Sequence, residues 1–186
     1  MDKEKVIATI TVMALEVIKT YQNELANLIF IGVARRGVPI AKIAAQVIYK
    51  QTGIAIPVIP VKIKIYNDDL SFVDSHGQPI SQPLKITESL DGKIIIVWDD
   101  VAYTLATTQA AFEIIRQAGQ PLKVEFAVLV DRFQWHQIGR EVYSPRFFGL
   151  QQPTKAGEIV KVQMEEIDGA TSVWLQEQIQ EGEADE

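Results

Sequence analysis

Residues 94–108 read IIIVWDDVAYTLATT, and this stretch decides the fold. An apolar run without alternating polar residues predicts a strand that is buried on both faces, as in the middle of a parallel sheet. The carboxylates of Asp99 and Asp100 end the run, and a turn rich in hydroxyls follows. From Gln109 to Ile115 the apolar spacing becomes helical. This order predicts an α/β fold, in which ligands bind at the carboxyl ends of the strands.

The turn between this strand and this helix has the chemistry of a phosphate site. A helix N-terminus offers unpaired backbone N–H groups and a partial positive charge, so we expect the turn from Tyr103 to Thr108 to hold a phosphate. Its additional hydroxyl donors are Thr104, Thr107 and Thr108. The carboxylates of Asp99 and Asp100 would repel a phosphate, but they suit the hydroxyls of an attached ribose or a bridging divalent metal. A 5-phosphoribosyl group combines these features.

The same stretch resembles the phosphoribosyl-diphosphate motif of type I phosphoribosyltransferases, which is an apolar run, an acidic pair, a short spacer and Thr-Gly-x-Thr. Leu105 stands where the family has Gly, and Ala106 stands where uracil-type members have a basic residue. Tyr103 takes the position where purine-type relatives carry Asp. The resemblance implies an α/β, type I phosphoribosyltransferase fold: a central, mostly parallel sheet flanked by helices, with a flexible flap.

A second strand-and-turn unit carries basic residues. Residues 28–33 (LIFIGV) predict another buried strand, and a helical pattern begins at Val38. Between them lie Arg35, Arg36 and Gly37, and the glycine lets the backbone pass close to a ligand. The arginines are either solvated surface residues or ligands of a diphosphate, whose oxygens a guanidinium matches in a bidentate manner. The resemblance favours the diphosphate, because Arg36 and Gly37 match the Thr-Arg-Gly of uracil-type members and Arg35 takes the Thr position.

Further similarity extends over residues 28–175. Residues 65–70, 127–132 and 162–168 look like segments of pyrimidine-operon attenuator/uracil phosphoribosyltransferase proteins. In that family the strand ending at Asp131 and Arg132 flanks the base site, although an Asp-Arg pair is equally typical of a structural ion pair. Pro153 and Thr154 match the family's Ile-Pro-Thr, which closes over the base. The polar segment 71–90 is the candidate flap.

Length, charge and cysteine content limit the possible classes. The 186 residues suit a single domain, which we place at 1–176, followed by an acidic tail at 177–186 that we expect to be disordered. Cysteine is absent, which excludes disulfides and fits a cytoplasmic location. The N-terminal segment has the features of neither a signal peptide nor a membrane span. A net charge of −6 disfavours RNA as a partner.

Several functions follow from the resemblance and remain open. The first is uracil phosphoribosyltransferase activity, with Mg²⁺ entering with phosphoribosyl diphosphate and contacting Asp99 and Asp100 indirectly, through the ligand. The second is a non-catalytic descendant that senses a nucleotide or binds a protein, which Leu105 and Ala106 favour because they weaken the phosphate turn. An RNA-binding attenuator is the third and is disfavoured by the acidic charge. The resemblance also implies a homo-oligomer, either a dimer or a tetramer.

Overall fold

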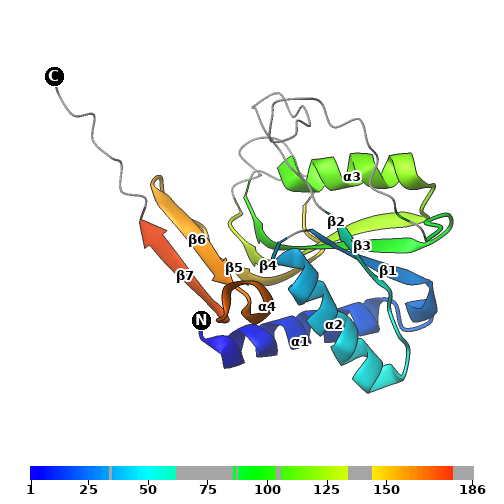
Figure 1. The fold of residues 1–186 in the computed structure, drawn as a ribbon, viewed down its shortest axis with the longest axis horizontal. Coiled ribbons are helices and arrows are strands. Elements are labelled where there is room, and N and C mark those ends of the chain that lie inside the picture. Colours follow the sequence, from blue (N-terminus) through cyan, green and yellow to red (C-terminus); the bar gives the residue numbers. More distant parts are fainter. Residues whose placement is uncertain (34, 62–85, 87, 104–105, 134–143, 178–186) are drawn as a thin grey trace.

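The chain forms a five-stranded sheet between two layers of helices (Figure 1). The computed structural model describes residues 1–33, 35–61, 86, 88–103, 106–133 and 144–177. The sheet has the order β2-β1-β3-β4-β5, and every pair of neighbouring strands is parallel. Its strands are β1 (Leu28–Val33), β2 (Val58–Val61), β3 (Ile94–Ala102), β4 (Lys123–Asp131) and β5 (Phe147–Gln151). The predicted α/β class with a parallel central sheet is therefore confirmed.

Helices cover both faces of this sheet. The helices α1 (Lys3–Thr20) and α2 (Gly37–Thr52) lie on one face, and α3 (Ala106–Ala118) lies on the other (Figure 1). On β3 the side chains alternate between the two cores: Ile96 and Trp98 pack with α1 and α2, whereas Ile95 and Val97 pack with α3. A strand that faces two cores needs apolar residues at every position, which explains the unbroken run.

The C-terminal part of the chain forms a separate hairpin. It consists of β6 (Glu158–Gln163), the short helix α4 (Glu165–Asp168) and β7 (Ser172–Glu177), and β6 and β7 pair antiparallel. This C-terminal hairpin lies beside the N-terminal end of α1 (Figure 1), where the amino group of Met1 donates to the carbonyl of Val173. A 3-10 turn, η1 (Leu25–Asn27), leads into β1.

One strand boundary differs from the prediction. β3 does not end at the acidic pair but continues to Ala102, because Val101 and Ala102 still pair with Val130 and Asp131 of β4. The proposed flap at 71–90 lies outside the described residues except for residues 86 and 88–90, and residues 178–186 of the proposed tail also lie outside them.

Candidate functional site

The parallel arrangement brings the predicted site residues to one edge of the sheet. β1 ends before Arg35 and Arg36, β3 carries Asp99 and Asp100 near its carboxyl end, and β4 ends at Asp131. Because neighbouring parallel strands run in the same direction, their carboxyl ends lie side by side, with β1 and β4 on either side of β3. The basic loop therefore flanks the acidic pair on one side, and the strand end of the predicted base site flanks it on the other.

The loop after β1 lies directly against β3. Gly37 begins α2, and a Cβ added to it would lie 2.2 Å from the carbonyl oxygen of Trp98 and 3.1 Å from the Cα of Asp99. No side chain fits in that space, so glycine is required for this close approach. The consequence is that Arg36 is held immediately beside the acidic end of β3. The pKa of Arg36 is raised chiefly by the hydrogen bond that it donates to Asp168, and the charge of Asp100 contributes as well.

The two carboxylates of β3 have different surroundings. Asp99 is 9% exposed, whereas Asp100 is half-buried. Burial raises the pKa of Asp99 well above its usual range, and the neighbouring charge of Asp100 raises it further. Asp99 accepts a hydrogen bond from the backbone N–H of Asp100 at 2.9 Å, and Asp100 accepts one from that of Val101 at 3.0 Å. A buried carboxylate with a raised pKa beside a second carboxylate is typical of a functional site.

Arg132 connects three of the predicted segments. Its Nε donates to Oγ1 of Thr154 at 2.8 Å, and its Nη2 donates to the carbonyl oxygen of Glu158 at 2.9 Å. Its guanidinium carbon lies 3.8 Å from the centre of the Tyr103 ring. Arg132 is buried, and this burial lowers its pKa. The arginine therefore ties the turn after β3 to the segment after β5 and to β6.

Asp131 is also buried, at 1% exposure, and its Oδ1 accepts a hydrogen bond from the backbone N–H of Phe133 at 2.9 Å. Arg132 bonds to Thr154 and Glu158, so the arginine links elements that are distant in the sequence. Pro153 is exposed beside the buried Thr154. Whether these residues contact a base stays a prediction.

The phosphate turn is described in part. Thr104 and Leu105 lie outside the described residues, and Ala106 and Thr107 are described only as the backbone that begins α3. Thr108 is buried in the first turn of α3, and Tyr103 is about half exposed. Within the described ranges, no three acidic or histidine side chains cluster closely enough to hold a metal ion. A Mg²⁺ ion at Asp99 and Asp100 would consequently need ligand oxygens to complete its coordination.

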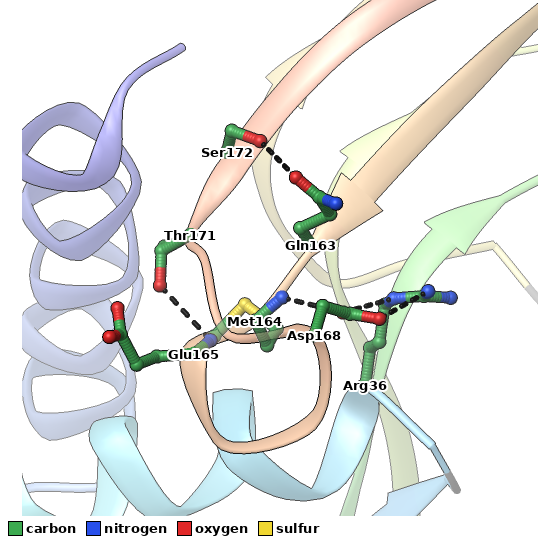
Figure 2. A network of polar contacts seen from close by, with 7 residues as sticks. All are labelled: Arg36, Gln163, Met164, Glu165, Asp168, Thr171 and Ser172. Atoms are coloured by element: carbon green, nitrogen blue, oxygen red, sulfur yellow. Dashed lines mark hydrogen bonds and ion pairs between the residues drawn. The ribbon is translucent and has the colours of Figure 1, made fainter.

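The sequence did not reveal what Arg36 contacts. Its guanidinium forms a bidentate ion pair with Asp168 of α4, with Nε to Oδ2 and Nη2 to Oδ1 both at 2.9 Å (Figure 2). The hydrogen bond from Arg36 and the backbone N–H of Met164 lower the pKa of Asp168. Asp168 lies in a segment that resembles the family, but this pair spans 132 residues of sequence, and no local pattern indicates such a contact.

Comparisons with known proteins agree with this architecture. A family model described as the phosphoribosyl transferase domain matches residues 2–137. The chain is 39% identical over 177 residues to a bifunctional protein PyrR from Microcystis aeruginosa, covering 94% of both chains. It is 38% identical over 176 residues to a protein of the same name from Acetivibrio thermocellus, covering 94% of this chain and 91% of that protein.

Solved structures show the same fold at low identity. A hypoxanthine phosphoribosyltransferase from Trypanosoma cruzi, determined with ternary substrates, has a TM-score of 0.67 at 15% identity and covers 90% of this chain and 87% of its own. A purine phosphoribosyltransferase from Pyrococcus horikoshii has a TM-score of 0.58 at 20% identity, with 82% and 85% covered. The type I fold predicted from the motifs is confirmed. Within the described ranges, no helix combines the length and the apolar character that crossing a bilayer requires.

Proposed function

The chain belongs to the phosphoribosyl transferase domain family, and we propose from this premise that it binds a phosphoribosyl or pyrimidine nucleotide ligand at the carboxyl edge of its sheet. One observation carries the proposal: Gly37 brings the basic loop against the backbone of β3 at the acidic pair. A sugar phosphate needs both kinds of group, with cationic or N–H donors for the phosphates and carboxylates for the hydroxyls.

Each part of the edge has a proposed role. Asp99 and Asp100 hold the ribose hydroxyls, and a Mg²⁺ ion bound to the ligand contacts them indirectly. The turn from Tyr103 to Thr108 holds the 5-phosphate, and the loop Arg35–Gly37 holds the diphosphate. Asp131, Arg132, Pro153 and Thr154 surround the base. Both relatives carry the name bifunctional protein PyrR, which does not state a base. The choice of a pyrimidine as the base therefore belongs to this proposal.

The reaction that this ligand set allows is uracil phosphoribosyl transfer. N1 of uracil attacks C1′ of phosphoribosyl diphosphate, and its proton passes to solvent water. The bond between C1′ and the diphosphate oxygen breaks, and diphosphate leaves with the electron pair to give UMP. The protein's part is to position the reactants and stabilise the charge of the leaving group.

A second candidate is a non-catalytic nucleotide sensor or protein-binding regulator, and the altered phosphate turn favours it. A leucine costs about 1 kcal/mol or more if the turn needs the left-handed geometry that the family's glycine allows. The missing basic residue at Ala106 removes a charge-assisted contact worth about 1.5–3 kcal/mol. RNA binding is a weaker candidate because the net charge is −6.

Calorimetric titration with Mg²⁺–phosphoribosyl diphosphate and with UMP tests the binding proposal. We expect a measurable heat from at least one of them, and the absence of heat from both would reject it. Adding uracil with phosphoribosyl diphosphate then separates the candidates, because release of diphosphate identifies a transferase and binding without turnover identifies a sensor.

The double variant Leu105→Gly, Ala106→Arg tests whether these two residues weaken binding. If these two residues weaken the site, restoring the family's residues should tighten phosphoribosyl diphosphate binding by about 100-fold, since each 1.4 kcal/mol corresponds to about tenfold in affinity. A matched control is Leu122→Gly, which changes an exposed leucine outside the site. Unchanged affinity in the double variant would reject this explanation while leaving the binding proposal to the titration of the wild type.

A further inference from the structure

The two arginines of the loop after β1 lie in different surroundings. Arg36 is engaged by Asp168 through two parallel hydrogen bonds of 2.9 Å each (Figure 2). Arg35 is exposed, and no hydrogen bond or ion pair joins its side chain to the residues that the structure describes. One guanidinium of the loop is thus already paired, and the other is available to a ligand.

The carboxylate that engages Arg36 is itself fixed. Besides the two hydrogen bonds from Arg36, the carboxylate of Asp168 accepts one from the backbone N–H of Met164, at 2.9 Å to Oδ2. The backbone N–H of Asp168 in turn donates to the carbonyl of Met164. Its side chain is 13% exposed, compared with 33% for Arg36. A carboxylate with three donors in a partly buried position stays ionised, and its pKa is held low by the hydrogen bonds from Arg36 and Met164.

Two further ion pairs join α4 to the helices α1 and α2. Glu165 pairs with Lys3 of α1 at 3.0 Å, and Glu166 pairs with Lys42 of α2. Both of these pairs are more than half exposed, so each contributes little to stability. The bidentate and less exposed pair between Arg36 and Asp168 is therefore the strongest polar link between the C-terminal hairpin and the helical layer among the described contacts.

This pairing reduces the value of Arg36 as a phosphate ligand. Asp168 occupies the Nε and Nη2 edge of the guanidinium, the arrangement that also suits a bidentate phosphate. An anion that took this edge would leave the carboxylate of Asp168 partly buried without its cation, and that carboxylate would repel the anion. Arg35 gives up no hydrogen bond to a described residue when it binds an anion, and its charge is the smallest of the influences that lower the pKa of Asp168.

We propose that the two arginines have separate roles: Arg35 binds the anionic phosphate or diphosphate group of the ligand, and Arg36 fastens the C-terminal hairpin to the loop through Asp168. The proposal rests on the proposed function, because it assigns a residue within that ligand site. The observation that separates the two arginines is the bidentate pair with Asp168, which engages Arg36 and not Arg35.

Calorimetry with inorganic diphosphate, in the presence and absence of Mg²⁺, tests the assignment on the full chain. We expect Arg35→Gln to weaken diphosphate binding by about tenfold or more, as the loss of one charge-assisted contact predicts. Asp168→Asn should not weaken this affinity and should raise it, because it removes the nearby negative charge and releases the guanidinium of Arg36. Glu166→Gln is the matched control, because it removes one negative charge from the same helix without touching Arg36.

Hydrogen exchange provides the readout for the fastening role. Asp168→Asn and Arg36→Gln should each speed amide exchange in β6 and β7 and lower the melting temperature, and the double variant should do little more than the stronger single variant, since both changes break one interaction. Glu166→Gln should leave exchange in both strands unchanged. Additive effects of the two single changes would contradict the fastening role. If Arg36→Gln fails to fold, Arg36→Lys takes its place, because lysine keeps the positive charge but lacks the paired N–H donors of the guanidinium.

The outcomes separate this inference from the proposed function. The division of roles is wrong if wild type binds diphosphate and Arg35→Gln binds it equally well. It is also wrong if Asp168→Asn loses affinity as strongly as Arg35→Gln. Neither result contradicts the proposed ligand site. If wild type binds neither diphosphate, phosphoribosyl diphosphate nor UMP, the proposed function fails, and the assignment of Arg35 fails with it.

Discussion

The guanidinium of Arg132 lies over the ring of Tyr103, with 3.8 Å between the guanidinium carbon and the ring centre. The two residues follow different strands: Tyr103 comes directly after β3, and Arg132 directly after β4. The backbone N–H of Arg132 also donates to the carbonyl of Ala102 at 2.9 Å, which brings the two strand ends together. The start of the phosphate turn at Tyr103 is consequently in contact with Arg132, a residue of the predicted base site.

Removing the Tyr103 ring should loosen this connection. A cation–π contact at a partly exposed site contributes about 0.5–2 kcal/mol, so Tyr103→Ala should lower the free energy of unfolding by that amount in urea titrations. Tyr103→Phe keeps the ring and should remain close to wild type. An equal loss in both variants would mean that the phenol hydroxyl, and not the stack on Arg132, is responsible.

The buried carboxylate of Asp99 should cost stability at neutral pH. Burial raises its pKa in the folded state, so between the unfolded value, about 3.9, and the raised value the folded protein binds more protons than the unfolded chain. Stability should fall as the pH rises through this window. Asp99→Asn should therefore raise the melting temperature at pH 7, and the gain should shrink as the pH approaches about 4.

Thermal melts from pH 4 to pH 8 check this prediction, with Glu113→Gln, an exposed carboxylate on α3, as the control. A residue that costs stability and is nevertheless present is typical of a binding or catalytic role, so Asp99→Asn should also weaken any phosphoribosyl ligand. A variant that is less stable than wild type at pH 7 would show that the carboxylate is structural.

Gly37 should tolerate no side chain. A Cβ there would lie 2.2 Å from the Trp98 carbonyl oxygen, and backbone cannot move aside as a side chain can. Gly37→Ala should destabilise the fold by about 1–3 kcal/mol or more, as overpacking of a dense interior does. The comparison is Gly53→Ala at the end of α2, where φ is +74° but no atom lies within 4 Å. That variant should lose only about 1 kcal/mol, and equal losses would contradict the role of close approach.

The sequence was sufficient to predict the elements that build the sheet edge. The run 28–33 is β1 with the same boundaries, and the apolar run at 94–98 is the buried centre of β3. These predictions succeeded because a strand that faces two cores is apolar throughout, a property that local sequence displays. The expected strand end at Asp99 was wrong by a few residues, because pairing with β4, which is not a local property, extends β3 to Ala102.

Contacts between distant segments were beyond local patterns. The pair between Arg36 and Asp168 depends on where the C-terminal hairpin lies against α2, and neither residue carries a signal for the other. For the adjacent Asp131 and Arg132 the sequence left an ion pair and a base site open, and it did not indicate that the arginine bonds to Thr154 and to the backbone of Glu158. The topology of the fold, and not the local sequence, determines these partners.

A buried network at the opposite end of β4 should separate stability from ligand binding. Glu125 is 8% exposed, accepts a hydrogen bond from the hydroxyl of Tyr21 and pairs with Lys123. Tyr21→Phe leaves the carboxylate without one donor in a buried position, which should cost about 1–3 kcal/mol in the free energy of unfolding. Burial and the hydrogen bond to Glu125 raise the pKa of Tyr21.

The alkaline pH dependence gives this prediction a second readout. The pKa of Tyr21 is higher in the folded state than in the unfolded chain. The contribution of Tyr21 to the free energy of unfolding is therefore complete below the unfolded pKa of about 10, and it is lost as the pH rises from there toward the folded pKa. The stability difference between wild type and Tyr21→Phe should narrow accordingly above pH 10. Since this network lies at the amino end of β4 and the candidate site at its carboxyl end, the variant should keep the diphosphate affinity of wild type. A loss of affinity comparable to that of Arg35→Gln would indicate that the two ends of the strand are coupled.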